Sequence, residues 1–591
     1  MFLPMTKQEM INRNWDNADF ILITGDAYID HPSFGAAIIS RLLESHGYKV
    51  CILAQPDWKD VNDFKRFGKP RLGFLITSGV VESMVNNYTV NKKKRKKDVY
   101  SPHNESGYRP DRAVIVYSNM ARQAYKDVPI ILGGIEASLR RLAHYDYWQN
   151  KIRRSILLDS KADLIVYGMG ERSIIEIADS LNNGVAISDI TFVNGTVYKT
   201  KDISYFDYLL LPSFAQLNED KHYYAKSFKI QSENTDSINA SILVEPYGDW
   251  YIVQNTPSSP LNPFDLDKVF DLPYESDYHP IYEDSGGIKA IQEVKHSIIA
   301  NRGCSGGCNF CALTYHQGRT VSARTKSSIL KEAKKIISDK EFKGYINDVG
   351  GPTANFFENM CDNQSKYGSC KHKKCLSPKC DQLNVSHKKY LSVLRALRNL
   401  PEIKKVFIRS GIRYDYLLLD NDKSFFKELV KYHISGQLRI APEHINSEVL
   451  RVMGKPEKAV YDDFVNQFNI YNKQFKKKQY IVPYFMSSHP GSDLSSAIDL
   501  AEYLHKTKQY PEQVQDFYPT PSTMSTVMFY TGINPVTMES IYIPKSDKEK
   551  KMQRALLQYK NPKNKRLVKE ALITDKREDL IGYEKHCLIR P

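Results

Sequence analysis

Cysteines are concentrated in one part of this sequence of 591 residues. Seven of the nine cysteines lie between positions 304 and 380, and the first three, Cys304, Cys308 and Cys311, follow the spacing Cys-x3-Cys-x2-Cys. Gly303 and Gly307 let the backbone fold tightly around a bound object. Because a disulfide framework does not suit a long chain without a secretory signal, the grouping indicates metal or cluster ligation.

Two kinds of metal site compete for this first cysteine group. A structural zinc ion takes four ligands, usually as two close pairs, whereas three thiols are grouped here. A cubane iron–sulfur cluster has four irons, each usually held by one thiolate, so three thiolates leave one iron open for a small molecule. The spacing therefore favours an open-site [4Fe-4S] cluster over zinc or over cysteines that merely pack.

The remaining four clustered cysteines form a second group in a polar segment. Cys361, Cys370, Cys375 and Cys380 are separated by eight, four and four residues, and His372 is a substitute ligand. Four thiols suffice for a closed structural zinc site or for an auxiliary iron–sulfur cluster. The sequence therefore predicts a second metal site in an insertion at 361–380. The spacing leaves zinc and iron–sulfur equally open, with packing cysteines as the further alternative.

Short apolar runs alternate with helical patterns through the first third of the chain. This alternation is typical of a parallel sheet with helices on both faces, so residues 1–199 are predicted to form a Rossmann-like domain of the α/β class. Residues 200–289 show little periodicity and are predicted to be a connecting region. The expected strands are 19–25, 48–53, 72–77, 128–134 and 162–168, with a helix at 36–44.

A second series of strands and helices follows. It predicts a partial (β/α)6 barrel over 290–535, and in such barrels functional groups gather on the loops after the strands. The Cys304 loop follows the first of these strands. A basic extension, 536–591, completes the chain. The expected strands are 293–300, 344–349, 404–409, 436–441, 479–487 and 513–517.

Positive charge is also concentrated. The formal net charge is +15, yet six consecutive basic residues at 92–97 and an excess of seven basic residues over 545–590 supply most of it. A solvated loop and tail explain these segments, and RNA is the alternative partner. The sequence has no apolar run that would span a bilayer and no signal peptide at its start, which predicts a cytoplasmic protein without a membrane partner.

The first cysteine loop resembles that of the radical S-adenosylmethionine (SAM) superfamily, including the aromatic Phe310 before the last cysteine. The stretches 301–319, 350–355, 410–415 and 441–444 are similar to the YgiQ-type family in particular, and this similarity runs from about residue 15 to 585. The resemblance names no substrate.

This resemblance implies a set of cofactors and a mechanism. Cys304, Cys308 and Cys311 would bind three irons of a [4Fe-4S] cluster, and the fourth iron would bind SAM. One electron, from a donor such as a flavodoxin or ferredoxin, would cleave SAM to methionine and a 5′-deoxyadenosyl radical that abstracts hydrogen from the substrate.

Five further positions are implied to contact SAM or substrate. The superfamily often has Glu after the paired glycines that follow the second strand, and Pro352 stands there in this chain. The positions implied are Gly350, Gly351, Ser410, Arg413 and Glu443.

The N-terminal domain resembles the cobalamin-binding-like domains that precede some radical SAM barrels. The cobalt-ligating motif Asp-x-His-x-x-Gly is absent, because Asp30 directly precedes His31 and the glycine, Gly35, is one place too far. We therefore do not expect bound cobalamin. The alternative to a radical SAM enzyme is a non-enzymatic, metal-stabilised nucleic-acid-binding protein that uses the basic loop and tail.

Overall fold

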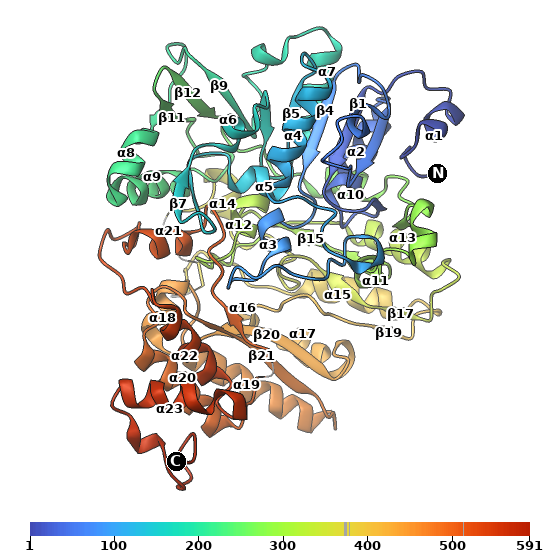
Figure 1. Cartoon of the computed structure of the whole chain (residues 1–591). Coiled ribbons are helices and arrows are strands. Elements are labelled where there is room, and N and C mark those ends of the chain that lie inside the picture. Colours follow the sequence, from blue (N-terminus) through green and yellow to red (C-terminus); the bar gives the residue numbers. More distant parts are fainter. Residues whose placement is uncertain (372–374, 377–378, 512) are drawn as a thin grey trace.

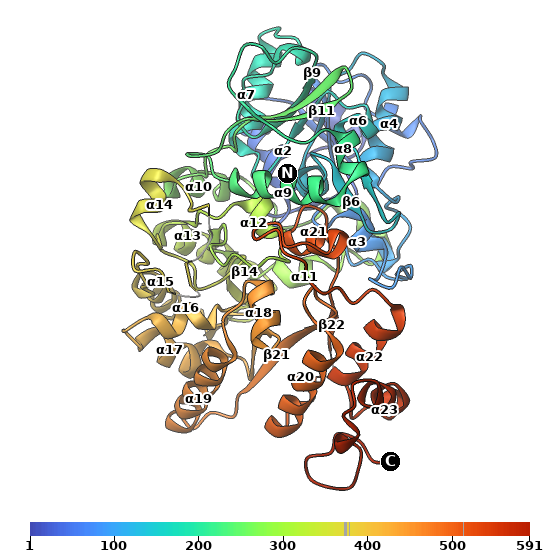
Figure 2. The ribbon, with the colours of Figure 1, turned by 90° about the vertical axis from the view of Figure 1, so that its left-hand side faces the viewer.

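The computed structural model of the chain describes residues 1–371, 375–376, 379–511 and 513–591. Figures 1 and 2 show an N-terminal sheet domain resting on a second unit of strands and helices, with the C-terminal helices at the end remote from the first domain. The two units meet along a broad boundary, so the loops of each can build a shared site.

Five parallel strands form one end of the nine-stranded N-terminal sheet, in the order β3-β1-β4-β5-β8, with β3 at the edge. The chain starts at β1, next to the edge, moves to the edge strand β3, and then crosses back over β1 to β4. In open α/β sheets, ligands bind at such a switch point, beyond the carboxyl ends of the strands. The strands are β1 (Phe20–Thr24), β3 (Val50–Ala54), β4 (Gly73–Thr77), β5 (Ile130–Leu132) and β8 (Leu164–Val166).

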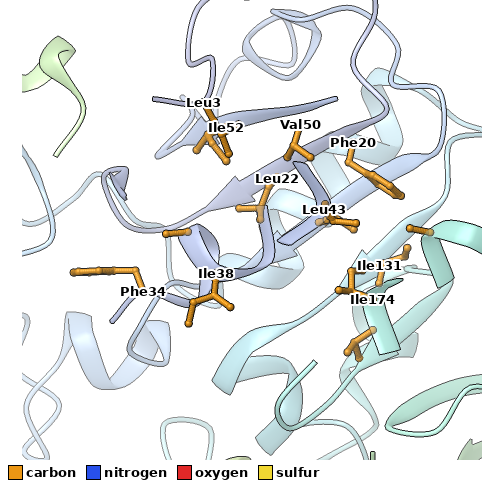
Figure 3. Packing of buried hydrophobic residues seen from close by; sticks show 14 of the residues in the cluster. Leu3, Phe20, Leu22, Phe34, Ile38, Leu43, Val50, Ile52, Ile131 and Ile174 are labelled. Atoms are coloured by element: carbon orange, nitrogen blue, oxygen red, sulfur yellow. The ribbon is translucent and has the colours of Figure 1, made fainter. Parts of the chain in front are cut away.

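Both faces of this sheet are buried, which explains why its strands are apolar throughout. In β1, Phe20 and Leu22 join the core beneath α2 (Gly35–Ser45) and α7 (Glu171–Asn182), as Figure 3 shows for part of that core. The alternating residues of β1 join the opposite core beneath α4 (Ala113–Ala124). Successive side chains of a strand point to opposite faces, so each face receives every second residue. The predicted Rossmann-like domain is confirmed.

The prediction that 200–289 is a connecting region is wrong for much of that length. The sheet continues past β8 through antiparallel strands to Gln254. The same stretch of chain also forms three helices, α8 (Phe214–Glu219), α9 (Lys221–Glu233) and α10 (Pro263–Phe270). These strands have short or mixed burial patterns rather than continuous apolar runs, so they lack the signal of a central parallel strand. They are β9 (Thr196–Thr200), β11 (Leu243–Tyr247) and β12 (Trp250–Gln254), and β10 (Leu209–Leu210) completes the edge by pairing parallel with β11.

Six strand positions build the partial barrel, and the pairings recorded between them are all parallel. The second position is divided into β17 and β18. Helices between the strands cover the outside and share one core with them. The strands are β14 (Ser297–Ile299), β17 (Tyr345–Ile346), β18 (Asp348–Gly350), β19 (Lys405–Val406), β20 (Gln437–Glu443), β21 (Tyr480–Ser487) and β22 (Gln515–Asp516). The covering helices include α13 (Lys326–Ile337), α15 (Lys388–Arg398), α19 (Lys458–Gln474) and α20 (Leu494–Thr507).

The basic extension is a folded part of the barrel rather than a free tail. Its helices α22 (Asp547–Leu557) and α23 (Lys565–Thr574) share an apolar core with α20 and with β21. Just before the extension, α21 (Met524–Thr531) packs against the N-terminal domain (Figure 2). The rings of Tyr145 and Tyr530 stack there at 4.5 Å. The C-terminal part of the chain therefore joins the two units.

The basic loop at 92–97 is exposed along its length, as expected for six like charges. Two isolated bridges, Tyr88 with Lys94 and Lys97 with Glu105, hold it to its neighbours. Among the described residues, no helix combines the length and the apolar character needed to cross a membrane.

Candidate active site

The first cysteine loop is closed by a small hairpin. Strands β15 (Asn301–Arg302) and β16 (Ser322–Ala323) pair antiparallel, so the chain between them leaves the barrel and returns to it. The Cys304 amide donates to the carbonyl of Gly318 at 3.1 Å. Gly303 has a φ of +80°, and a Cβ there would overlap the carbonyl oxygen of Thr320. Glycine is therefore required where the loop begins.

Contacts from the opposite side of the barrel fix the middle of the loop. The Asn309 amide donates to the Met453 carbonyl at 2.9 Å, and its side-chain Nδ2 donates to the Val452 carbonyl at 2.8 Å. The Asn309 carbonyl accepts from the Ser525 amide at 3.0 Å. Since these partners belong to α18 (Ser447–Met453) and α21, the loop is held from two helices at once.

The structure brings the three thiols of the loop into one partly buried neighbourhood. Cys304, Cys308 and Cys311 are free and partly buried. Burial, together with the neighbouring thiolates of Cys308 and Cys304, raises the pKa of the Cys311 thiol to about 12. Such a site holds thiolates once positive charge is bound among them, which suits iron.

A single metal ion and a cubane cluster make different demands on this geometry. Among the described residues, no three His, Cys, Asp or Glu side chains are drawn together closely enough to hold one ion. In a cubane each thiolate binds a separate iron, so the sulfurs are not required to meet at one point.

Arg413 is the cation closest to these thiols. It follows β19, is buried, and is held by Asp415, whose oxygens accept from its Nε at 2.8 Å and its Nη2 at 2.5 Å. Its Nη1 donates to the Gly306 carbonyl at 3.1 Å and lies 3.6 Å from the Cys308 sulfur. Burial disfavours the charge, but Asp415 and the neighbouring thiolates more than offset this and raise the pKa of Arg413.

Gly350 and Gly351 lie at the end of β18, where the backbone of the barrel is most crowded. A Cβ at Gly350 would overlap the Ser410 hydroxyl, and one at Gly351 would overlap Asn301. The Ser410 hydroxyl donates to Asp348, which also accepts from the Ser410 amide at 3.2 Å. The predicted residues Gly350, Gly351 and Ser410 therefore lie together. Asp348, which sequence reasoning missed, is the residue that joins them.

Glu443 ends β20 in an unusual state for a carboxylate. Its φ is +69°, it is buried, and its Oε2 has no hydrogen-bond partner. Burial raises its pKa, which Lys455 opposes. A buried acceptor without a partner destabilises the free protein and offers a contact to an amine or hydroxyl of a ligand.

We expect Glu443→Gln to stabilise the ligand-free protein while weakening SAM binding. Because the folded-state pKa of Glu443 is raised, ionised Glu443 is destabilising above that pKa, and protonation removes the penalty as pH falls through it. At neutral pH the variant should gain about 1–2 kcal/mol in free energy of unfolding and lose about tenfold or more in SAM affinity. Urea unfolding across pH and calorimetric titration with SAM measure both; a gain that persists at low pH would contradict the ionisation argument.

Phe310 packs inside the mouth of the barrel. It lies against the apolar residues Val449, Met453, Met486 and Phe517, and its ring meets His489 edge-on at 6.0 Å. His489 is buried on the loop after β21, and burial lowers its pKa to about 3. The Cys304 loop is thus supported by an apolar cluster next to a neutral histidine that the sequence did not single out.

A cavity of about 520 Å³ lies between the N-terminal sheet and the barrel. Its upper wall is formed by residues at the carboxyl ends of β1, β4, β5 and β8, which is where the switch point of the sheet predicts a ligand. Its lower wall includes Gly350, Gly351 and Ser410. The cavity therefore joins the carboxyl edge of the first domain to the glycine-rich loop of the second.

One buried ion pair crosses this boundary. Arg302 donates to Glu171, and both residues line the cavity. Each also keeps one buried polar atom without a partner, Nη2 of Arg302 and Oε2 of Glu171. Neither residue was among the predicted site residues, because an Arg and a Glu that are far apart in sequence give no local pattern.

His31 is held within its own turn. It is buried, burial lowers its pKa to about 3, and its Nδ1 accepts from the Ser33 amide at 3.1 Å within the same turn. This agrees with the interpretation of His31 as a turn residue.

The cysteines of the second group also lie near one another in the structure. Cys361, Cys370, Cys375 and Cys380 are free, and the Cys380 amide donates to the Cys375 carbonyl at 2.9 Å. Burial raises the pKa of Cys375, and the other three cysteines all lie near enough to raise it further. His372 lies outside the described residues.

Comparison with known proteins gives successive matches along the whole chain. Family models described as Radical SAM N-terminal, Radical SAM superfamily, and a domain of unknown function (DUF3362) match residues 2–297, 298–504 and 512–591. A UPF0313 protein of Clostridium perfringens is 57% identical over 592 residues, covering 100% of this chain and 89% of the relative. A UPF0313 protein of Clostridium botulinum is 58% identical over 590 residues, covering 100% and 92%.

Among solved structures, the cobalamin-dependent S-adenosylmethionine radical enzyme OxsB with aqua-cobalamin bound has a similar fold. The TM-score is 0.51 at 10% sequence identity, over 98% of this chain and 73% of that chain. At this identity the likeness concerns the fold alone.

Proposed function

Because this chain belongs to the UPF0313 (YgiQ) family and carries a radical SAM domain, we propose that it is an enzyme that cleaves SAM reductively with a [4Fe-4S] cluster. The family assignment confirms the resemblance seen in the sequence. The observation that carries the proposal is the gathering of Cys304, Cys308 and Cys311 beside the buried Arg413, at the mouth of a barrel. When bound, the cluster supplies the electron that cleaves SAM and starts radical chemistry on the substrate.

The residues present fit this pair of cofactors. Three thiolates would hold three irons, and the Arg413 guanidinium would stabilise their negative charge at Cys308. The unpartnered oxygen of Glu443 would accept a hydrogen bond from SAM, and glycine at 350 and 351 lets the backbone there approach Ser410 and Asn301 closely. Phe310 and the apolar cluster behind it would keep water from the loop.

The substrate would occupy the cavity between the two domains. Its volume of about 520 Å³ suits a small molecule or one extruded group of a larger one. RNA stays the candidate for a larger substrate, because the exposed basic loop at 92–97 would attract phosphates. A flavodoxin or ferredoxin would supply the electron, and a cytoplasmic location fits such a donor. The comparisons give no support to a non-enzymatic nucleic-acid-binding protein, and the absence of cobalamin stays a prediction.

The test is a cleavage assay on anaerobically reconstituted full-length protein. With SAM and dithionite we expect 5′-deoxyadenosine and methionine, and none of either without the reductant. Because some enzymes of this kind cleave SAM only with substrate present, the electron paramagnetic resonance spectrum of the reduced protein is recorded with and without SAM. No product together with an unchanged spectrum would overturn the proposal.

A further inference from the structure

The four cysteines of the second group are gathered by contacts from several parts of the chain. Leu376 and Lys379 form a bridge that brings Cys375 and Cys380 together, and the two are joined by the backbone hydrogen bond already described. The segment before Cys370 is tied to the N-terminal domain, since the Ser369 amide donates to Asp236 at 3.0 Å. The insertion therefore contacts the N-terminal domain at Ser369.

A buried arginine faces this group. The Arg319 Nη1 donates to the Cys370 carbonyl at 2.7 Å, and its Nη2 lies 3.9 Å from the Cys375 sulfur. Its Nε is buried without a partner, and among the described residues no carboxylate lies within ion-pair distance of it. A buried cation in this position needs a negative partner, and a set of bound thiolates supplies one.

The same arginine connects the two cysteine groups. The Arg319 carbonyl accepts from the Ser305 hydroxyl at 2.9 Å, next to Cys304 in the first loop, while its side chain reaches Cys370 and Cys375. Cys304, Cys375 and Cys380 also pack against one apolar cluster, which consists of Phe356, Met360, Leu383 and Tyr416. The two groups are thus neighbours across a shared, water-excluding core.

The second group extends from this core to the surface. Cys370 is exposed, whereas Cys375 and Cys380 are partly buried against the apolar cluster. Lys366, Lys371 and Lys379 from the same segment are exposed, as are Asp362 and Asp381, so the exposed charges described there are three positive and two negative. An exposed edge with positive charge is suited to receive an acidic protein partner.

We propose that Cys361, Cys370, Cys375 and Cys380 hold an auxiliary iron–sulfur cluster that carries one electron from the protein surface to the Cys304 loop. The cluster would take one electron from a reduced ferredoxin- or flavodoxin-type donor and pass the same electron on, with no bond formed or broken in the polypeptide. Its position between an exposed edge and the first group favours iron over zinc, because zinc has no redox chemistry. The electron-relay role rests on the proposed function, whereas the metal site does not.

The test separates the two sites by their ligands. The triple variant Cys304→Ala, Cys308→Ala, Cys311→Ala is reconstituted anaerobically, and iron, sulfide and zinc are measured per chain. We expect about eight irons in the wild type and about four in the triple variant, with a Mössbauer spectrum of a cluster. Adding Cys375→Ala and Cys380→Ala should remove the rest. Cys587→Ala, which changes a partly buried cysteine outside both groups, is the matched control and should keep all of the iron.

The outcomes discriminate between the proposals. Zinc in place of iron in the triple variant, or no metal in it, would overturn the auxiliary cluster and leave the first site untouched. If the triple variant does not fold, the wild type still decides: reduced protein should show two cluster signals, of which SAM alters one. A single signal that SAM alters would contradict the auxiliary cluster while supporting SAM binding at the first site.

Arg319 offers a second, independent readout. Arg319→Gln removes a positive charge beside Cys375 and should lower the reduction potential of one cluster signal, because the added electron loses a favourable charge interaction. Arg319→Lys should restore part of the shift. Equal shifts of both signals, or none, would contradict the assigned position.

Discussion

Replacing Cys308 by alanine should abolish 5′-deoxyadenosine formation, with a fall of more than about a hundredfold. The loop offers three thiols, and removal of one leaves two, too few to retain an open-site cluster. Alanine also leaves the Arg413 guanidinium without the sulfur that lies 3.6 Å from its Nη1. The rate is measured under dithionite, with iron content determined on the same sample.

Cys51→Ala is the matched control for this variant. Cys51 is fully buried in β3, and its pKa is raised to about 12 by burial. Its loss should cost stability but leave cleavage per folded chain unchanged. Equal activity of the Cys308 variant and the wild type would show that this thiol is not a ligand, and the proposed site would fail.

Replacing Arg413 by methionine should destabilise the barrel by about 3–5 kcal/mol, because a buried charge loses its partner. Asp415 is buried; burial raises its pKa, but Arg413 more than offsets this and holds the pKa below its ordinary value. Without the guanidinium, the carboxylate would stay buried and unpaired or take up a proton. Urea unfolding of the metal-free protein measures the loss.

A second substitution tests whether the unpaired charge of Asp415 causes this loss of stability. Arg413→Met combined with Asp415→Leu removes both charges, so the double variant should recover much of the stability that the single variant loses. Recovery of stability without recovery of SAM cleavage would separate the structural part of Arg413 from its contact with Cys308. If the double variant is as unstable as the single one, the buried pair is not the cause.

The parallel strands of the N-terminal sheet could be predicted because burial on both faces leaves a simple signal. In β1, five consecutive buried residues read as one apolar run, and the following glycine-bearing turn leads into α2. Barrel strands such as β20 and β21 were found within a few residues, although burial alternates along β20 and β21 is fully buried only at its end. Helices such as α13 and α20 showed apolar spacing and a side-chain cap at their start.

The strands at the antiparallel end of the N-terminal sheet were missed for the opposite reason. In β11 and β12 the buried residues are confined to one end of each strand, and Pro246 interrupts the first run. A proline inside a run lowers its weight as a strand. The signal that was present is the Gly248-Asp249 turn between two runs rich in aromatic and branched residues, which is typical of a hairpin.

Parts of the candidate site that are local in sequence could be predicted, whereas contacts between distant segments could not. The cysteine loop is recognisable because its ligands are local in sequence, and the paired glycines follow a strand. Asp348, the Arg302–Glu171 pair and the contact from Arg319 to Cys370 and Cys375 depend on folds that bring distant segments together. No spacing in the sequence encodes those contacts.

The seating of α21 on the N-terminal domain has a consequence for how this protein is made. The surface around Tyr145 that α21 covers is synthesised about 385 residues before Tyr530 reaches it. At about 5–20 residues per second, ribosomes leave that apolar surface uncovered for roughly twenty to eighty seconds. A nascent chain in that interval displays an unmatched aromatic patch, so the yield of active protein should depend on translation speed and on chaperones that shield the patch until the last helices emerge.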